Sequence, residues 1–316
     1  MRTYPLLPLL FLLLATACSE NTSFLPTTEE KSEVLRLLSV QVDEGETART
    51  LTTTENLNNL RLYATTIGGA AYTGNNGKSY GDYTKTVNGW EPTGTAQIKI
   101  NSDAYIYAVY PGGSIISQSG SDAPLASVNV QAKDSFTPTL QTDYLYSSTP
   151  QTVRSANHQV SFTHMRHALA KVSFKVTKLG NENMTLTKIE IREKNNSLLA
   201  GNGTMNITDG TLSGGLGGVS TLTLTGSVIL GENLTDPNIT CLTAPASNMN
   251  GLTFRLTITT GTETHTLETD VLNNEQTWEK SKHYVYTISV GKGQIEFKNM
   301  RIYDWLDDAT TTVGIQ

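Results

Sequence analysis

The chain has 316 residues, a formal net charge of −6 and only 16% charged residues. This sparse, slightly acidic charge argues against nucleic acid and against an anionic membrane surface as the main partner, since both attract clustered positive charge. The length predicts about two domains of ~150 residues each. Thr, Ser, Asn and Gly are plentiful while Lys and Glu are sparse, which favours strands and turns over surface helices.

The N-terminus has the features of an export signal. Arg2 supplies a positive charge, and a short apolar run from Leu6 to Leu14 follows it. This run is well below the ~20 residues that span a bilayer as a helix, so we predict a secretory signal peptide over residues 1–17. Because Cys18 directly follows small residues, the segment resembles a bacterial lipoprotein signal, in which this cysteine becomes the lipid-modified first residue. The alternative is an ordinary signal peptide with an incidental cysteine.

Cys241 is the other cysteine of the chain. If Cys18 carries lipid, Cys241 has no partner, and the exported chain contains no disulfide. Cys241 lies in the stretch "ITCLTAP", where nothing nearby resembles a catalytic base. We therefore expect a small buried core residue rather than a nucleophile.

The first strand is predicted over residues 34–42, "VLRLLSVQV", after a polar tether. Strict alternation of apolar and polar residues is typical of a half-buried strand. The face predicted to be buried consists of Val34, Leu38, Val40 and Val42. A polar, turn-rich segment follows, and it contains Arg49, the only basic residue between Arg36 and Arg61.

Short strand-like segments separated by Gly, Asn and Pro turns continue along the chain. The clearest of them read "LNNLRLYATT", "AQIKINSDAYIYAVY", "KVSFKV", "LTKIEIRE", "LTFRLTITT" and "HYVYTISV". No convincing long helix is present in the pattern. Many short strands with such turns predict an all-β fold of antiparallel β-sandwiches. The division between two domains is expected near residues 155–167.

Candidate sites for chemistry are weak. His164 and His167 are three residues apart, and this spacing on a strand points them to opposite faces. Asp304, Asp307 and Asp308 lack the alternating oxygen ligands and turn glycine of a calcium loop, so we expect surface charges. Motifs for a serine-hydrolase elbow, a zinc protease or a phosphate loop are missing from the sequence. The sequence therefore predicts no enzyme, no cofactor and no metal site.

Several motifs together resemble the fimbrillin family of Bacteroidetes, the subunits of type V pili. They are the Cys18 signal, the strand before Arg49, "YIYAVYPGG", "DYLYSS", "VSFTHMRHALAKVSFKV", "YVYTISV" and the closing "IYDW". The most telling piece is "FTHMRHALAKV", residues 162–172. The resemblance implies two tandem transthyretin-like antiparallel β-sandwich domains, which we place at residues 50–165 and 166–316.

The same resemblance implies how the chain matures. The precursor is exported as a lipoprotein to the outer membrane, and a trypsin-like, arginine-specific protease cuts the loop after the first strand. We identify Arg49–Thr50 as the bond that is cut, because the small polar residues around it suit an exposed loop. Residues 18–49 then form a propeptide that leaves with its strand, and a strand from a neighbouring subunit fills the open groove. The alternative is that Arg49 is a solvated arginine in a turn.

The predicted donor strand, which would fill the groove of a neighbouring copy of the chain, is the C-terminal segment 307–316, "DDATTTVGIQ". It is Thr-rich and free of Pro. The side chains on one face are Ala309, Thr311, Val313 and Ile315. A slip of one residue would present the opposite face, so these positions would set the register. The alternatives are a frayed terminus and a final strand within its own domain.

The resemblance implies a structural pilin that forms a fimbrium on the cell surface from head-to-tail copies and contributes to adhesion. The alternative is a tip adhesin or a surface lipoprotein that binds glycan or host protein through its loops. In that case Tyr72, Tyr80, Tyr83 and Trp90 would line a sugar site, although the same aromatic residues fit cross-strand packing, which is commoner. A third possibility is an anchor subunit that keeps its lipid, and a cleavable Arg49 argues against it.

Overall fold

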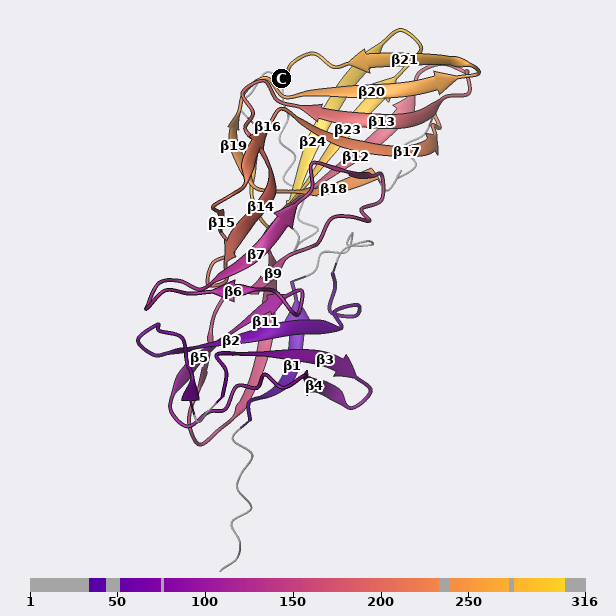
Figure 1. The fold of residues 1–316 in the computed structure, drawn as a ribbon. Helices are drawn as coiled ribbons and strands as arrows, with labels where there is room; N and C mark the ends of the chain where they lie inside the picture. Colours follow the sequence, from indigo (N-terminus) through magenta and orange to yellow (C-terminus); the bar gives the residue numbers. More distant parts are fainter. Residues whose placement is uncertain (1–33, 44–51, 75–76, 233–238, 273–275, 305–316) are drawn as a thin grey trace, which may run out of the picture. The chain divides into compact units, whose positions relative to one another are not determined.

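The computed structural model describes residues 34–43, 52–74, 77–232, 239–272 and 276–304. In these ranges the regular elements are β-strands, without an α-helix, which confirms the all-β prediction (Figure 1). Accordingly, none of the described segments forms a helix of the length and apolarity needed to cross a membrane.

The largest sheet is built from eight strands between Arg36 and His167. Its order is β1 (Arg36–Val42), β11 (Gln159–His167), β9 (Leu145–Ser147), β5 (Ala104–Tyr110), β2 (Asn59–Thr66), β3 (Tyr80–Thr86) and β4 (Gly89–Thr93), and β10 (Gln151–Val153) pairs with β5. Because β1 stands at one end of this order, β11 is its one ladder partner among the described strands.

Two further sheets share a second core and form a β-sandwich. One has the order β18 (Ile239–Thr243), β12 (Ala170–Lys178), β23 (Lys282–Val290) and β24 (Ile295–Asp304). The other has the order β21 (Glu263–Glu268), β20 (Thr253–Thr260), β13 (Thr185–Arg192), β17 (Thr221–Ile229) and β8 (Lys133–Ser135). Figure 1 shows β20, β13 and β17 running side by side, as this order requires.

Two smaller sheets complete the described structure. One contains β15 (Leu212–Ser213), β14 (Leu198–Asn206), β7 (Leu125–Val130) and β6 (Ile116–Ser117), with β16 (Gly217–Val219) paired to β14. The other is the pair β19 (Ala246–Met249) and β22 (Gln276–Trp278). Since β7 pairs with β14, and β8 pairs with β17, the ladders cross the domain boundary expected at 165/166. The boundary itself stays a prediction.

Strand direction departs in part from the expectation of antiparallel sandwiches. Most pairs are antiparallel, but β1 with β11, β12 with β23, and β17 with β8 run parallel. A parallel pair needs a long connection that returns the chain to the same end of the sheet. Each of these pairs joins segments far apart in the sequence, and this long-range pairing has no local sequence signature.

The cores confirm the alternation that was predicted for the regular strands. In β5, Ile106 and Ala108 belong to one buried cluster while Tyr107 and Val109 belong to another, so both faces of this strand are covered. In the β-sandwich, the predicted faces are buried at Val172, Phe174, Val176, Ile189, Ile191, Leu252, Phe254, Leu256 and Ile258. These strands are regular enough for a two-residue period to predict their inner side.

Candidate functional site at the first strand

The predicted first strand exists, but its buried face differs from the prediction. Leu38, which was assigned to the buried face, is 51% exposed, and Val34 is half-buried. The residues that point into the core are Leu35, Leu37, Val40 and Val42. The ladder shifts register between Leu37 and Ser39, which marks a bulge at this point. One extra residue in a strand reverses the alternation beyond it, so the inner positions are odd before the bulge and even after it.

Side chains of the large sheet line the groove that β1 fills. Leu35 is fully buried and Leu37 is 3% exposed. The ladder places Leu37 opposite Val160, Val40 opposite Phe162 and Val42 opposite Met165. These side chains share one buried cluster with others from β2, β3 and β5. β1 therefore completes the core of this sheet.

The backbone of β1 is held at both ends by hydrogen bonds. Near its start, the amide of Leu35 donates to the carbonyl of Ile98 over 2.9 Å, and the amide of Arg36 donates to His158 over 2.7 Å. Near its end, the amide of Asp43 donates to the carbonyl of Met165 over 2.9 Å. The strand is thus fully integrated into its sheet, and its removal would leave polar backbone groups that need new partners.

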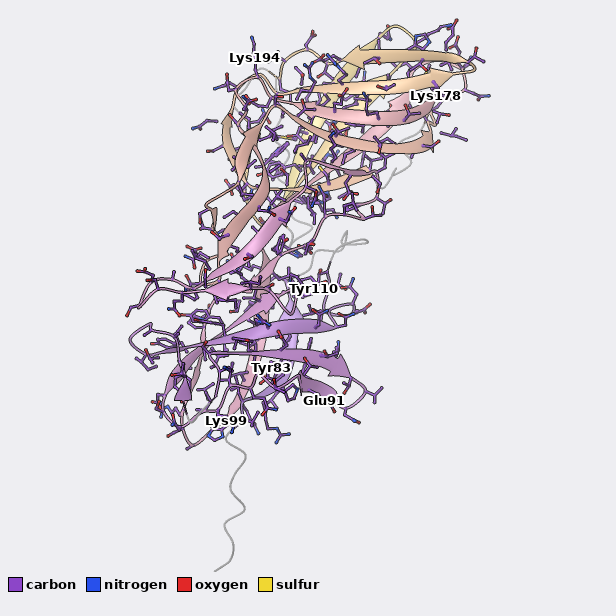
Figure 2. All side chains as sticks on the ribbon, viewed as in Figure 1. Tyr83, Glu91, Lys99, Tyr110, Lys178 and Lys194 are labelled. Atoms are coloured by element: carbon purple, nitrogen blue, oxygen red, sulfur yellow. The ribbon has the colours of Figure 1, made fainter. Side chains whose placement is uncertain are left out.

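A buried tyrosine fastens the start of β1 from the opposite side of the core. Tyr83, on β3 and labelled in Figure 2, is 1% exposed, and its hydroxyl donates to the carbonyl of Leu35 over 2.6 Å. Burial raises the pKa of the Tyr83 hydroxyl, which therefore keeps its proton and remains a donor. The acceptor is the residue directly before β1, so this contact holds the start of the strand.

A charged cluster lies at the other end of β1. Asp43 is 9% exposed, and its carboxylate accepts from Nδ1 of His164 over 2.9 Å and from Nε of Arg166 over 3.4 Å. A carboxylate only accepts hydrogen bonds, so the proton of this contact belongs to Nδ1 of His164. Both donors come from the exposed side of β11. The cluster therefore ties the end of β1 to the strand beside it.

The chain is anchored again after residues 44–51, which lie outside the described residues. The amide of Thr52 donates to Asp143 over 3.0 Å, and Nδ1 of the buried His167 lies 2.9 Å from the same carboxylate. Thr54 accepts from the amide of Val42 over 2.8 Å. Separate contacts thus hold the chain on each side of the segment that contains Arg49.

The other predicted site residues fall into two groups. Those outside the described residues are Cys18, Arg49, Thr50, Asp307, Asp308, Ala309, Thr311, Val313 and Ile315. Among the described ones, Cys241 is buried as expected, and burial raises the pKa of its thiol to about 12. Asp304 pairs with Lys282. The described residues include no group of three or more His, Cys, Asp or Glu side chains that could hold a metal ion.

The two histidines of "HMRH" differ in exposure, and the four predicted aromatic residues pack in or against the cores. His164 is exposed and His167 is buried, as their spacing predicted. Tyr72 and Tyr83 are buried, and Tyr80 and Trp90 pack against the cores as half-buried side chains. These side chains therefore serve cross-strand packing and do not form an exposed stacking platform.

A family model described as fimbrillin-like matches residues 47–305. The chain belongs to the fimbrillin-like family. The resemblance that the motifs carried is thereby confirmed. None of the curated proteins matches this fimbrillin-like sequence.

Solved structures similar to this fimbrillin-like chain come from Bacteroides. One is a fimbrial protein from Bacteroides vulgatus, with TM-score 0.57 and 15% identity, covering 85% of this chain and 99% of that one. Another, from Bacteroides ovatus and assigned to cell adhesion, has TM-score 0.56 and 15% identity, covering 86% and 98%. A third, from Bacteroides uniformis with the same assignment, has TM-score 0.51 and 18% identity, covering 86% and 99%. At this identity the likeness establishes a shared fold.

Several residues of the fimbrillin-like site were missed from the sequence. Leu35 and Leu37 form a second alternating set in the same stretch, and reading both registers would have found them. Asp43, Tyr83 and Asp143 act through contacts across the sheet, which no local pattern reveals.

Proposed function

We propose that this fimbrillin-like chain is a structural pilin subunit of a type V pilus, polymerised by donor-strand exchange and contributing to adhesion. The observation that carries the proposal is that β1, an edge strand with one ladder partner among the described strands, together with the preceding Leu35 buries four side chains directly before the segment with Arg49. In the proposed pathway the precursor is exported as a lipoprotein through Cys18 and carried to the outer membrane. An arginine-specific protease then cuts Arg49–Thr50, and residues 18–49 leave with β1.

The loss of β1 would create an adhesive surface. It would expose the edge of β11 and the trough that Leu35, Leu37, Val40 and Val42 fill. An unpaired edge over a hydrophobic trough is the most interaction-prone surface of a sheet. An incoming strand restores the backbone ladder, while alternate side chains fill the trough.

The expected energies suit a switch between precursor and polymer. Four buried aliphatic side chains contribute roughly 6–12 kcal/mol as an upper bound, at ~1.5–3 kcal/mol each. A micromolar complex has a binding free energy of ~8 kcal/mol. The burial energy of the four side chains reaches this value, although the cost of association has still to be subtracted from it. In the precursor, β1 is tethered to its groove and outcompetes any second chain because of its high effective concentration. Cutting the tether removes this advantage.

A donor strand near the C-terminus would make the contact head-to-tail. The proposed donor is residues 307–316, with Ala309, Thr311, Val313 and Ile315 on its inner face. A head-to-tail contact that does not close into a ring produces a filament. The subunits are proposed to comprise two transthyretin-like domains, 50–165 and 166–316, with a structural and non-enzymatic role.

Limited proteolysis with electron microscopy tests the proposal. The purified chain is treated with trypsin, the new N-terminus is read by mass spectrometry, and the sample is imaged before and after the cut. We expect an N-terminus at Thr50 and filaments only after cleavage. Arg49→Gln should remain monomeric, while the matched control Arg36→Gln, an exposed arginine within β1, should still assemble. A different N-terminus, or filaments from Arg49→Gln, would contradict the assignment.

A further inference from the structure

The charged cluster at the end of β1 is divided between two segments with different proposed fates. His164 and Arg166 belong to β11, which stays in the subunit. Asp43 belongs to the segment that the proposed cut removes. On the proposed function, on which this inference rests, maturation therefore takes away the carboxylate and leaves both donors at the rim of the groove.

We propose that His164 and Arg166 recognise a carboxylate on the incoming strand, and that Asp308 of a second copy of this chain supplies it. An arginine and a histidine whose shared acceptor has left favour a new acceptor of negative charge. Asp43 shows that this position accommodates a carboxylate while the strand beside it remains in the ladder. The cluster thus selects which strand, and which direction of it, enters the groove.

The position of Asp43 relative to the trough defines what the strand must carry. Asp43 directly follows Val42, the last side chain that fills the trough, and its own side chain reaches the exposed side of β11. The carboxylate must therefore stand one residue beyond the last inward side chain. In the donor segment, Asp308 stands next to Ala309, which has the inward parity.

This match sets the direction of the donor strand. Asp308 precedes the inward residues of its segment, whereas Asp43 follows those of β1. A strand that places Asp308 beside Arg166 therefore runs antiparallel to β11, opposite to the parallel β1. Antiparallel pairing is slightly more stable per residue, so the exchange gains rather than loses ladder energy.

The spacing of the trough agrees with a regular strand in that direction. Val160 and Phe162 are two residues apart on β11, but their partners Leu37 and Val40 are three apart because β1 is bulged there. A donor without a bulge fills the same two places with residues two apart. Ala309, Thr311, Val313 and Ile315 have this spacing. Because alternate residues of a strand face opposite sides, Asp307 would be on the same side as these four residues. Asp308 would be on the other side, as Asp43 is in β1.

Peptide binding to the trypsin-cut, β1-free chain tests the inference. The probe is a fluorescent peptide of residues 305–316 with an amidated C-terminus. We expect Asp308→Asn in the peptide to weaken binding about five- to tenfold at low salt, with the difference shrinking as salt is added. Asp307→Asn makes the same change of charge one residue away and should alter the affinity less than twofold.

The reciprocal change in the protein isolates the contact. Arg166→Gln should weaken binding of the wild-type peptide and reduce the further loss caused by Asp308→Asn, because a coupled pair is not additive and His164 remains as a donor. Arg154→Gln, a matched exposed arginine outside the cluster, should leave the affinity unchanged. Equal binding of all peptides, or a larger loss from Asp307→Asn, would overturn the inference while the groove hypothesis stands. A chain that binds no peptide at all would overturn both.

Discussion

The two large cores of this molecule are closed in different ways. In the β-sandwich, β12 lies between β18 and β23, so its backbone is paired on both sides. In the eight-stranded sheet, β1 stands at an edge and pairs with β11. Both regions contain a parallel pair, β12 with β23 and β1 with β11, so direction is not what distinguishes them.

The difference lies in what the removal of one strand would break. Taking out β12 would break two ladders and open the aromatic packing of Phe174 against Phe254 and Tyr286. Taking out β1 would break one ladder and empty one trough, while the rest of its sheet keeps its pairs. An edge strand is therefore the element that a chain can exchange without unfolding.

The largest expected effect comes from a charge placed on the inner face of β1. Leu37 is 3% exposed, and Leu37→Asp would bury an unpaired carboxylate at a cost of several kcal/mol. β1 can avoid this cost by leaving its groove. The destabilisation caused by Leu37→Asp therefore cannot exceed the free energy with which β1 docks into the groove. We expect the uncut variant to form oligomers without protease, measured by analytical ultracentrifugation and electron microscopy.

The neighbouring residue supplies the matched control. Leu38 is 51% exposed in the same strand, and Leu38→Asp should leave the uncut chain monomeric and its stability within about 0.5 kcal/mol of the wild type. Equal behaviour of the two variants would contradict the bulged register of β1. Oligomers from Leu38→Asp alone would instead support the face that the sequence pattern first predicted.

The next largest effect concerns the β-sandwich. The Phe254 ring lies 5.1 Å from that of Phe174 and 4.6 Å from that of Tyr286, between centroids, and is fully buried. We expect Phe254→Ala to lower the free energy of unfolding by about 3–5 kcal/mol, measured by urea denaturation. Assembly after trypsin should persist under conditions where the variant is folded. Loss of assembly in a folded variant would show that the two regions are not separable.

This contrast also marks how far sequence patterns reach. The inner faces of β12 and β20 were predictable because both strands are regular and one face of each is buried. The inner face of β1 was mispredicted at Leu38, because a bulge reverses parity and leaves no signature in residue type. Parallel pairing was also missed, since it depends on contacts between segments far apart in the chain.

The site was predictable only in outline. The position of the strand before Arg49 follows from alternation, whereas the roles proposed for Cys18 and Arg49 come from the family resemblance alone and stay predictions. Tyr83 and Asp43 were not predictable, because each acts across the sheet on a residue distant in sequence. Short-range periodicity reports which face is buried, whereas hydrogen-bond partners are set by tertiary register.

A third prediction uses acid to weaken the β-sandwich selectively. His283, on β23, is buried, and burial together with Lys171 and Lys175 lowers the pKa of its ring to about 2. The folded chain therefore binds fewer protons than the unfolded chain between pH ~6.5 and about 2. The stability that comes from keeping His283 neutral is fully present above pH ~6.5. As the pH falls below this value, the free energy of unfolding decreases by up to about 1.4 kcal/mol per pH unit.

The comparison variant for this prediction is His283→Gln, which removes the titrating ring. Urea denaturation between pH 7 and 4 should show a flatter pH dependence for the variant than for the wild type. Hydrogen exchange of the β1 amides in the uncut chain measures how firmly this strand is held. Its opening free energy should change less with pH over the same range than the stability of the β-sandwich. Identical slopes for wild type and His283→Gln would rule out this histidine as the acid-sensitive group.

The smallest expected effect tests the hold on β1 alone. Tyr83→Phe removes the hydroxyl that donates to the carbonyl of Leu35 and keeps the ring. A lost hydrogen bond of this kind costs about 0.5–1.5 kcal/mol, which corresponds to roughly two- to tenfold faster hydrogen exchange if β1 opens locally. Tyr72→Phe is the matched control, because its buried hydroxyl accepts from the amides of Asn101 and Ser102. Faster exchange in β1 for Tyr83→Phe but not for Tyr72→Phe would show that the Tyr83–Leu35 hydrogen bond holds this edge strand specifically. Equal acceleration in both would mean that β1 opens only with its whole sheet, which would remove the distinction between the exchangeable edge and the fixed core.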